Sequence, residues 1–233
     1  MSFQYKYYWP IAIGLSFLLP FIIGFYYGRP FGGLLWGGFL RLTLVHHFTF
    51  FINSLCHYAG TRPFESNISA RDSWWVSYLT FGEGFHNYHH KFQWDYRNGI
   101  RWYDFDPGKW IVKFLSYFGL TTDIRKVEEY QILNAKMDGL IKSMQVNYQK
   151  IPEEIQKIYQ IKIEEIQGTA IQVYKSWQEM EKEFKLLKAN KISKLKLNTF
   201  KKQRKLFRLE YVSSLNMLSI LLIGIQNGNY IQN

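Results

Sequence analysis

The first 60 residues are dominated by apolar side chains. One apolar run, residues 7–27, ends at Gly28-Arg29-Pro30, and a second run follows from about 31 to 54. About 20 helical residues cross the ~30 Å hydrocarbon core of a bilayer. The pattern therefore predicts an antiparallel transmembrane hairpin over residues 1–60. A buried helical hairpin in a soluble protein is the alternative, and the lack of a polar outer face disfavours it.

Within residues 61–127, the stretch 61–105 is dense in Trp, Tyr, Arg and Asp, which predicts loops and short helices. Asp106 followed by Pro107 is typical of an N-cap with proline at the first helical position. The helix expected over 108–120 combines apolar residues with lysines, so it is suited to lying on a membrane surface. We expect this segment to form a cytosolic cap on the hairpin.

Residues 128–233 are rich in Lys, Glu and Gln, and their apolar positions recur at steps of three and four. This seam predicts a coiled coil or helical hairpin, and its members are Tyr159, Ile163, Ile166, Ala170, Val173, Trp177, Met180, Phe184 and Leu187. The last apolar run, 217–225, is too short by itself to span a bilayer. The fold class expected is an all-α membrane protein with a charged helical extension.

Charge limits the partners. The net charge of +11 favours either nucleic acid or an anionic membrane. Trp and Tyr flank the apolar segments instead of alternating with basic residues, which favours a lipid interface and not nucleic acid. Residues 185–208 hold ten Lys or Arg and no acid, so they form either a solvated face or a site for anionic headgroups.

Topology follows from the same charges. Nearly all Lys and Arg come after residue 60, which places both ends of the hairpin in the cytoplasm. The localisation expected is a multi-pass integral membrane protein. Cys56 is the one cysteine, so an intramolecular disulfide and a cysteine-based metal site are both excluded.

The six histidines all lie within 45 residues. Three of them form the motif His86-x-x-His89-His90. On a helix, positions i, i+3 and i+4 share one face, so three imidazoles are expected to converge. Imidazole nitrogen suits iron, copper, zinc and nickel. The motif predicts a metal site.

Asn53 and His57 are a second pair, at i and i+4 near the end of the second span. His57 is either a further ligand or an interfacial hydrogen-bonding residue, whereas Asn53 suits holding a bound water. His46 lies roughly 16 Å from His57 by helical rise. We therefore interpret His46 and His47 as packing or hydrogen-bonding residues and not as ligands.

Other chemistries lack their motifs. No His-Glu-x-x-His pattern of a zinc protease occurs. Gly82-Glu83-Gly84 has no preceding strand pattern, which argues against a dinucleotide site. The Ser and Cys residues are not in a nucleophile-elbow context.

Two segments resemble the membrane fatty-acid desaturases of the acyl-CoA and Δ9 type. Residues 53–63, Asn-Ser-Leu-Cys-His-Tyr-Ala-Gly-Thr-Arg-Pro, resemble the end of that family's fourth span. Residues 81–102, which include Phe-His-Asn-Tyr-His-His and Asp-Tyr-Arg-Asn-Gly, closely match its third histidine box. Residues 106–110 continue the match, and the resemblance covers about residues 7–127.

The resemblance implies a cofactor of two iron ions held by histidines without bridging carboxylates. It implies that His57, His86, His89 and His90 are ligands and that Asn53 holds an iron through water. The site would lie just outside the cytoplasmic membrane face. Aromatic side chains near it are candidates for an acyl tunnel, with plain packing as the alternative for each: Phe50, Trp74, Trp75 and Trp94.

The implied reaction introduces a cis double bond into an acyl-CoA or acyl-lipid. It uses O2 and electrons from a ferredoxin or a cytochrome b5-type donor. The family's first two histidine boxes precede its third span, and nothing before Tyr7 supplies them. We therefore expect the C-terminal half of a desaturase, from a fragment, a split gene or a wrongly assigned start, with the missing half as a partner.

Two other functions remain open. One is a nonenzymatic membrane protein that binds metal or lipid and keeps the histidine box. The other is a related histidine-box di-iron hydroxylase or ketolase. The long match after the histidine box, through Asp95, Arg97 and Asn98, favours a desaturase over a hydroxylase.

Overall fold

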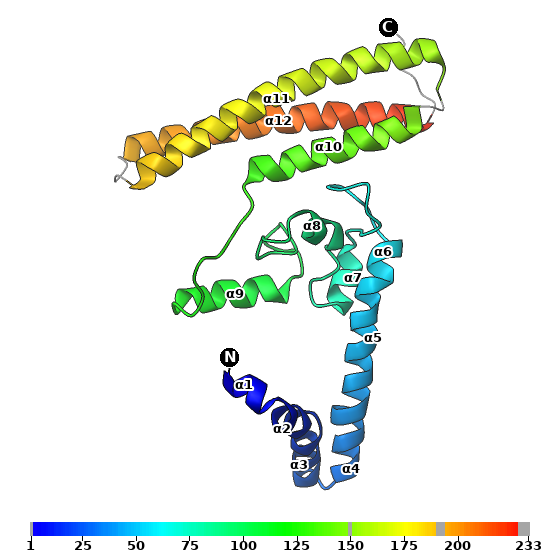
Figure 1. Cartoon of the computed structure of the whole chain (residues 1–233), viewed down its shortest axis with the longest axis vertical. Helices are drawn as coiled ribbons and strands as arrows, with labels where there is room; N and C mark the ends of the chain where they lie inside the picture. The colour runs from blue at the N-terminus through cyan, green and yellow to red at the C-terminus, as the bar shows by residue number, and fades with distance from the viewer. Residues whose placement is uncertain (1, 149–150, 190–193, 228–233) are drawn as a thin grey trace.

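The computed structural model describes residues 2–148, 151–189 and 194–227. Within these ranges the secondary structure is helical, apart from two isolated bridges that join Asp72 to Thr61 and to Phe85. Figure 1 shows a helical hairpin at one end, three long helices at the other and a segment of short helices between them. The expected all-α membrane fold is confirmed.

The hairpin consists of two antiparallel arms, each interrupted by a π-helical stretch (Figure 1). The first arm comprises α1 (Ser2–Lys6), α2 (Tyr8–Ile13), η1 (Gly14–Leu18) and α3 (Leu19–Tyr26), and the second α4 (Pro30–Gly33), η2 (Leu34–Leu40) and α5 (Arg41–Asn53). The stretch η1 ends two residues before Pro20 and contains Ser16, four residues before that proline. Proline has no N–H for the regular ladder and its ring crowds the carbonyl four residues earlier, so a local change of register is expected there.

Glycines allow the two arms to approach closely. A Cβ atom added to Gly24 would lie 2.8 Å from the Cα of Gly33, and one added to Gly37 would lie 2.9 Å from the Pro20 side chain. Small residues serve the same purpose in many transmembrane helix pairs. The turn between the arms uses Gly28 with φ +69°. The predicted hairpin is therefore observed as a packed pair.

Two described helices are long and apolar enough to cross a membrane, and only one of them is an expected span. Tyr8–Tyr26, with a mean hydropathy of 1.8, coincides with the first predicted span, and the other helix is Lys196–Asn227, with 1.4. The second arm is not among them, so its spanning role stays a prediction. Arg41, His46 and His47 lower its hydropathy. Residues 217–225 are part of the longer helix Lys196–Asn227, and the expectation that this run by itself is too short to span a bilayer stays a prediction.

The middle segment holds α6 (Leu55–Tyr58), α7 (Trp74–Leu79), α8 (His86–Lys91) and α9 (Pro107–Tyr117). Asp106 caps α9 by accepting a hydrogen bond from the Lys109 amide at 3.0 Å, which confirms the predicted N-cap. The same carboxylate accepts from the amides of Asn98 and Gly99 at 2.7 and 3.0 Å. The α9 side chains Ile111 and Phe114 point outward and are exposed.

The three long helices α10 (Glu129–Tyr148), α11 (Glu153–Ala189) and α12 (Lys194–Asn227) form a bundle. The predicted seam lies in its core, where Tyr159, Ala170 and Trp177 of α11 are almost wholly buried against α12 residues such as Tyr211 and Leu218. The seam continues through a contact between the Phe184 and Phe200 rings, 5.2 Å apart. The predicted helical hairpin of this region is confirmed as part of a bundle.

Candidate metal centre

Three histidines come together where α6 meets α8. His57, His86 and His90 each place a ring nitrogen within 4.8 Å of those of the other two. The Nε2 atoms of His86 and His90 are 3.1 Å apart, and the His57 ring centroid lies 5.0 Å from that of His86. The predicted proximity of His57 to the histidine motif is therefore present.

His89 lies beside this group and not within it. Its ring centroid is 6.3 Å from that of His86 and 6.0 Å from that of His90. On a helix, residues three and four positions after His86 lie to either side of it. The expectation that all three imidazoles of the motif converge on one point holds for His86 and His90, and His89 flanks them.

Helix α8 is held in place by the residues between its histidines. The side chain of Asn87 is fully buried. It accepts hydrogen bonds from the amides of Phe64 and Glu65 at 2.9 and 3.2 Å, and it donates to the carbonyls of Glu65 and Ala70 at 2.8 and 2.9 Å. These four bonds fix the loop of residues 61–73 against α8. The histidines are thereby turned to the opposite side.

Tyr88 anchors α8 to a buried ion pair. Its hydroxyl donates to Asp95 at 2.7 Å, and Asp95 binds the Arg97 guanidinium at 2.7 and 3.0 Å. Burial alone would raise the pKa of Asp95, but the hydrogen bonds from Arg97 and Tyr88 outweigh it and lower this pKa. Asp95 also accepts from the Val127 amide at 2.9 Å. The ion pair therefore connects α8 to the loop around Val127 that leads into α10.

The chemistry of the donors fits a metal ion held by imidazoles. Burial, and then the neighbouring His90 and His57, lower the pKa of His86 to about 4, and burial also lowers that of His90. Both are therefore neutral at pH 7, which is the form that binds metals. Nitrogens 3.1 Å apart suit two ligands of one ion, since metal–imidazole distances in zinc sites are about 2.0–2.1 Å.

Hydrogen bonds around the cluster support the same conclusion. His57 Nδ1 lies 2.8 Å from the Ser69 hydroxyl, which leaves Nε2 for a metal. Such a second partner commonly orients a metal-binding histidine. His86 Nδ1 is buried and has no hydrogen-bond partner among the described residues. The cluster is thus a group of histidines in which one buried ring nitrogen, His86 Nδ1, has no hydrogen-bond partner among the described residues.

The helix does not run unbroken from Asn53 to His57. Helix α5 ends at Asn53, and Ser54, with φ −112° and ψ −70°, separates it from α6. The Ser54 hydroxyl donates to the Phe50 carbonyl at 2.9 Å. The argument that Asn53 and His57 share one continuous helical face was therefore wrong. The role of the exposed Asn53 stays a prediction.

The other histidines lie on the exposed surface of α5. His46 Nδ1 lies 2.8 Å from the Leu42 carbonyl, and His46 is not part of the three-histidine group. The rings proposed for an acyl tunnel are also exposed, and their role stays a prediction. Trp74 lines a pocket of about 830 Å³. The other three side chains are exposed and do not line that pocket: Phe50, Trp75 and Trp94.

Several residues of the matched segment have structural roles that the sequence did not indicate. Lys109 is buried, and its ammonium donates to the carbonyls of Gly99, Arg101 and Asp104 at 2.9, 2.8 and 3.1 Å. Charged residues are usually exposed unless paired, so spacing alone gave no signal for the burial of Lys109 or Arg97.

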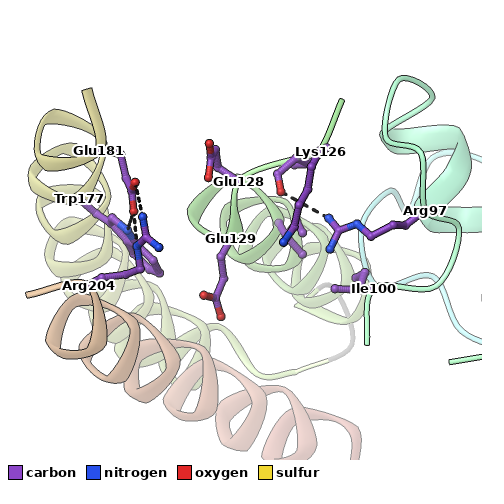
Figure 2. A pocket seen from close by; sticks show the side chains of 10 residues that line it. Arg97, Ile100, Lys126, Glu128, Glu129, Trp177, Glu181 and Arg204 are labelled. Carbon is purple, nitrogen blue, oxygen red and sulfur yellow. Dashed lines mark hydrogen bonds and ion pairs between the residues drawn. The ribbon is translucent and has the colours of Figure 1, made fainter. Parts of the chain in front are cut away.

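A separate pocket of about 260 Å³ lies where the middle segment meets the bundle (Figure 2). Glu181 binds Arg204 at 2.6 Å through both of its oxygens and accepts from the Trp177 indole at 3.1 Å. The charges that line this pocket are largely paired, and none of the histidines lines it. The three-histidine cluster is therefore the better candidate site.

Comparison with known proteins agrees with this site. The sequence model of the family described as "Fatty acid desaturase" matches residues 1–122. The chain is 40% identical over 151 residues to acyl-CoA desaturase 1 of Saccharomyces cerevisiae, which covers 64% of this chain and 29% of that protein. It is 44% identical over 124 residues to an sn-1 stearoyl-lipid 9-desaturase of Synechocystis, and this match covers 53% of this chain and 36% of that protein.

A third relative, Delta-9 acyl-lipid desaturase 1 of Arabidopsis thaliana, is 41% identical over 117 residues, or 50% of this chain and 38% of that protein. The chain thus spans about a third of the length of these relatives. The family match covers more than half of the chain, and it includes the three histidines that the structure brings together. The chain belongs to the fatty acid desaturase family.

Proposed function

We propose that this chain provides part of a membrane fatty-acid desaturase that uses two iron ions and O2. The observation that carries the proposal is the convergence of His57, His86 and His90 in a chain of this family. Relatives are named acyl-CoA desaturase and stearoyl-lipid 9-desaturase. The substrate proposed here is accordingly a fatty acyl-CoA or an acyl-lipid.

The proposed ligands divide into two groups. His57, His86 and His90 hold one iron, because their nitrogens lie together. His89 would bind the second iron, because it lies beside the three-histidine group and not within it, and Asn53 would act through a bound water. The iron ions supply the oxidising chemistry when bound. The described residues orient the imidazoles, and burial keeps His86 neutral.

The overall reaction balances. Two adjacent CH2 groups of the acyl chain lose one hydrogen each and become a cis CH=CH unit, while O2 takes up these two hydrogens, two electrons and two protons to give two molecules of water. A ferredoxin or a cytochrome b5-type protein is the proposed electron donor. The acyl chain enters from the bilayer on the cytoplasmic side, where the exposed apolar face of α9 lies on the membrane surface.

The remaining iron ligands come from a segment outside these 233 residues. Metal sites lose function when their geometry is wrong by about an ångström, and four histidines are few for two irons that must be held through redox cycles. The short coverage of the relatives supports this proposal. Residues 1–233 alone are therefore expected to be inactive.

The test is complementation in a yeast strain that lacks its own acyl-CoA desaturase. The chain is expressed alone, or fused behind the N-terminal part of the Saccharomyces relative, and fatty acids are analysed by mass spectrometry. Unsaturated product is expected only with the fusion, and iron content should rise with activity. Desaturation by residues 1–233 alone would contradict the incomplete site, and a hydroxylated product would identify a hydroxylase instead.

The ligand assignment is tested within the same fusion. His86→Ala or His90→Ala should abolish desaturation while membrane insertion is unchanged, because insertion depends on the apolar hairpin. His47→Ala is the matched control, since His47 is exposed on α5 outside the cluster, and it should retain activity. Full activity in the His86→Ala fusion would show that the cluster is not the iron site.

A further inference from the structure

Helix α12 presents apolar side chains on two sides, and the bundle covers only one of them. The exposed set, here called the α12 stripe, is centred on Ser213 and comprises Leu206, Leu209, Ser213, Met217, Ile220 and Ile223. Its five apolar members are between 51% and 63% exposed. Their spacing places them along one side of the helix. An unpaired apolar row of this length is unusual on a surface that faces only water.

A groove runs beside the stripe. A pocket of about 570 Å³ lies between α11 and α12, and its lining includes Ile166 and Thr169 of α11 with Ser213, Met217 and Ile220 of α12. Three-helix arrangements leave such a groove, and a fourth helix packed into it completes a four-helix bundle. The shape of the site therefore suits a helix.

The stripe is complementary to itself in the antiparallel direction. Leu206 and Ile220 lie seven residues to either side of Ser213, and Leu209 and Met217 lie four residues to either side. In two antiparallel copies with Ser213 against Ser213, Leu206 therefore faces Ile220 and Leu209 faces Met217, while Ile223 lies opposite the polar Gln203 at the edge of the contact. The small serine at the centre lets the helices approach closely. Such a two-fold pairing buries the same patch on both copies.

The charges of α12 select the antiparallel arrangement. Residues 194–208 contain seven Lys or Arg and no acid, while residues 209–227 contain one Glu and no Lys or Arg. A parallel pair would bring two basic halves together. An antiparallel pair instead places each basic half beside an uncharged half and beside residues 153–170 of α11, which hold four Glu and two Lys. Glu165 and Glu210 both line the groove.

The position of α12 argues against the bilayer as the occupant, although the helix is apolar enough to cross one. In Figure 1 the bundle lies on the far side of the middle segment from the hairpin, and α12 runs crosswise to α5. A hairpin inserted in the membrane therefore holds the stripe away from it. We propose that the α12 stripe and its groove bind a second copy of this chain, with the two α12 helices antiparallel and centred on Ser213.

The first test is a symmetric cross-link in the full chain, purified in detergent. Ser213→Cys should give a disulfide-linked dimer on mild oxidation, and a reductant should reverse it. Ser219→Cys is the matched control, because Ser219 lies on the same helix but lines the pocket on the α10 side. The native Cys56 is fully buried in both variants. Equal cross-linking of the two variants, or none in Ser213→Cys, would overturn the proposal.

The second test measures mass by light scattering without any cross-link. Wild type should have the mass of a dimer, and Leu209→Glu should raise the dimer dissociation constant by about tenfold or more, because it places a charge in the contact. Leu186→Glu is the control, since Leu186 is exposed on α11 outside the groove, and it should remain a dimer. A monomeric wild type, or quenching of a fluorophore at Ser213 by a lipid-phase quencher in vesicles, would contradict the pairing.

Discussion

At the scale of single residues, the histidine site depends on side chains that never touch a metal. Asn87 satisfies two donors and two acceptors of the loop that covers α8. Tyr88, through its bond to Asp95, gives the same short helix a second anchor. A helix of six residues has little stability by itself, so these contacts determine which way the imidazoles point.

Replacing Asn87 should therefore cost stability. Asn87→Ala leaves the amides of Phe64 and Glu65 buried without a partner, and a loss on the order of 3 kcal/mol is expected. The measurement is thermal or denaturant unfolding of the full chain in detergent. Asn147→Ala is the control, because Asn147 is only partly buried and donates one bond, to the Ser143 carbonyl. Similar losses in the two variants would contradict the role of Asn87.

At the scale of secondary-structure elements, one carboxylate joins the histidine helix to the C-terminal bundle. Glu65 binds Lys91 at the end of α8 at 2.9 Å and Lys142 of α10 at 3.0 Å. Its side chain is only 19% exposed, so water screens this pair of contacts less than a surface ion pair. The hydrogen bonds from Lys91 and then Lys142 lower the pKa of Glu65 to about 2.

This pKa predicts how stability depends on pH. A carboxylate whose pKa is lowered by folding stabilises the protein at every pH above its ordinary pKa of 4.5. That stabilisation is lost as the pH falls toward the folded-state pKa of about 2. Glu65→Gln should therefore melt at a lower temperature than wild type at pH 7, and the difference should shrink below pH 4.5. The exposed Glu164, which accepts from Gln160, provides the control Glu164→Gln. A difference that is independent of pH would contradict the prediction.

At the scale of the whole molecule, the structure divides into a hairpin, a middle segment and a bundle (Figure 1). We propose that only the hairpin crosses the membrane and that the other two parts lie in the cytoplasm. Many apolar side chains of the hairpin, such as Leu15, Phe25 and Leu35, are more than half exposed. Lipid is the environment that suits them.

Cysteine labelling in intact cells tests this topology. Tyr27→Cys, at the hairpin turn, should react with a membrane-impermeant maleimide added outside, whereas Tyr103→Cys in the middle segment should react only after permeabilisation. Both side chains are exposed, and Tyr27 avoids the positive φ of Gly28. Labelling of both cysteines from the same side would rule out the hairpin orientation.

The sequence by itself determined the features that depend on local periodicity. An apolar helix long enough for the first span, the N-cap at Asp106 and the seam from Tyr159 to Trp177 were all predicted and are all present. Hydropathy and helical spacing are properties of one to five consecutive helical turns, so they can be recognised in the sequence without any tertiary contact. The histidine motif likewise indicated metal binding, because its spacing on one turn is a local property.

The tertiary structure alone decided which histidines form a group. His57 reaches His86 and His90 because the loop of residues 61–73 folds back and is held by Asn87, while a break at Ser54 separates α6 from α5. The burial of Arg97 and Lys109 could not be predicted from the sequence either, because it depends on hydrogen-bond partners that only the fold brings close. Long-range contacts of this kind leave no periodic pattern in the sequence, and they are what converts a row of imidazoles into a site.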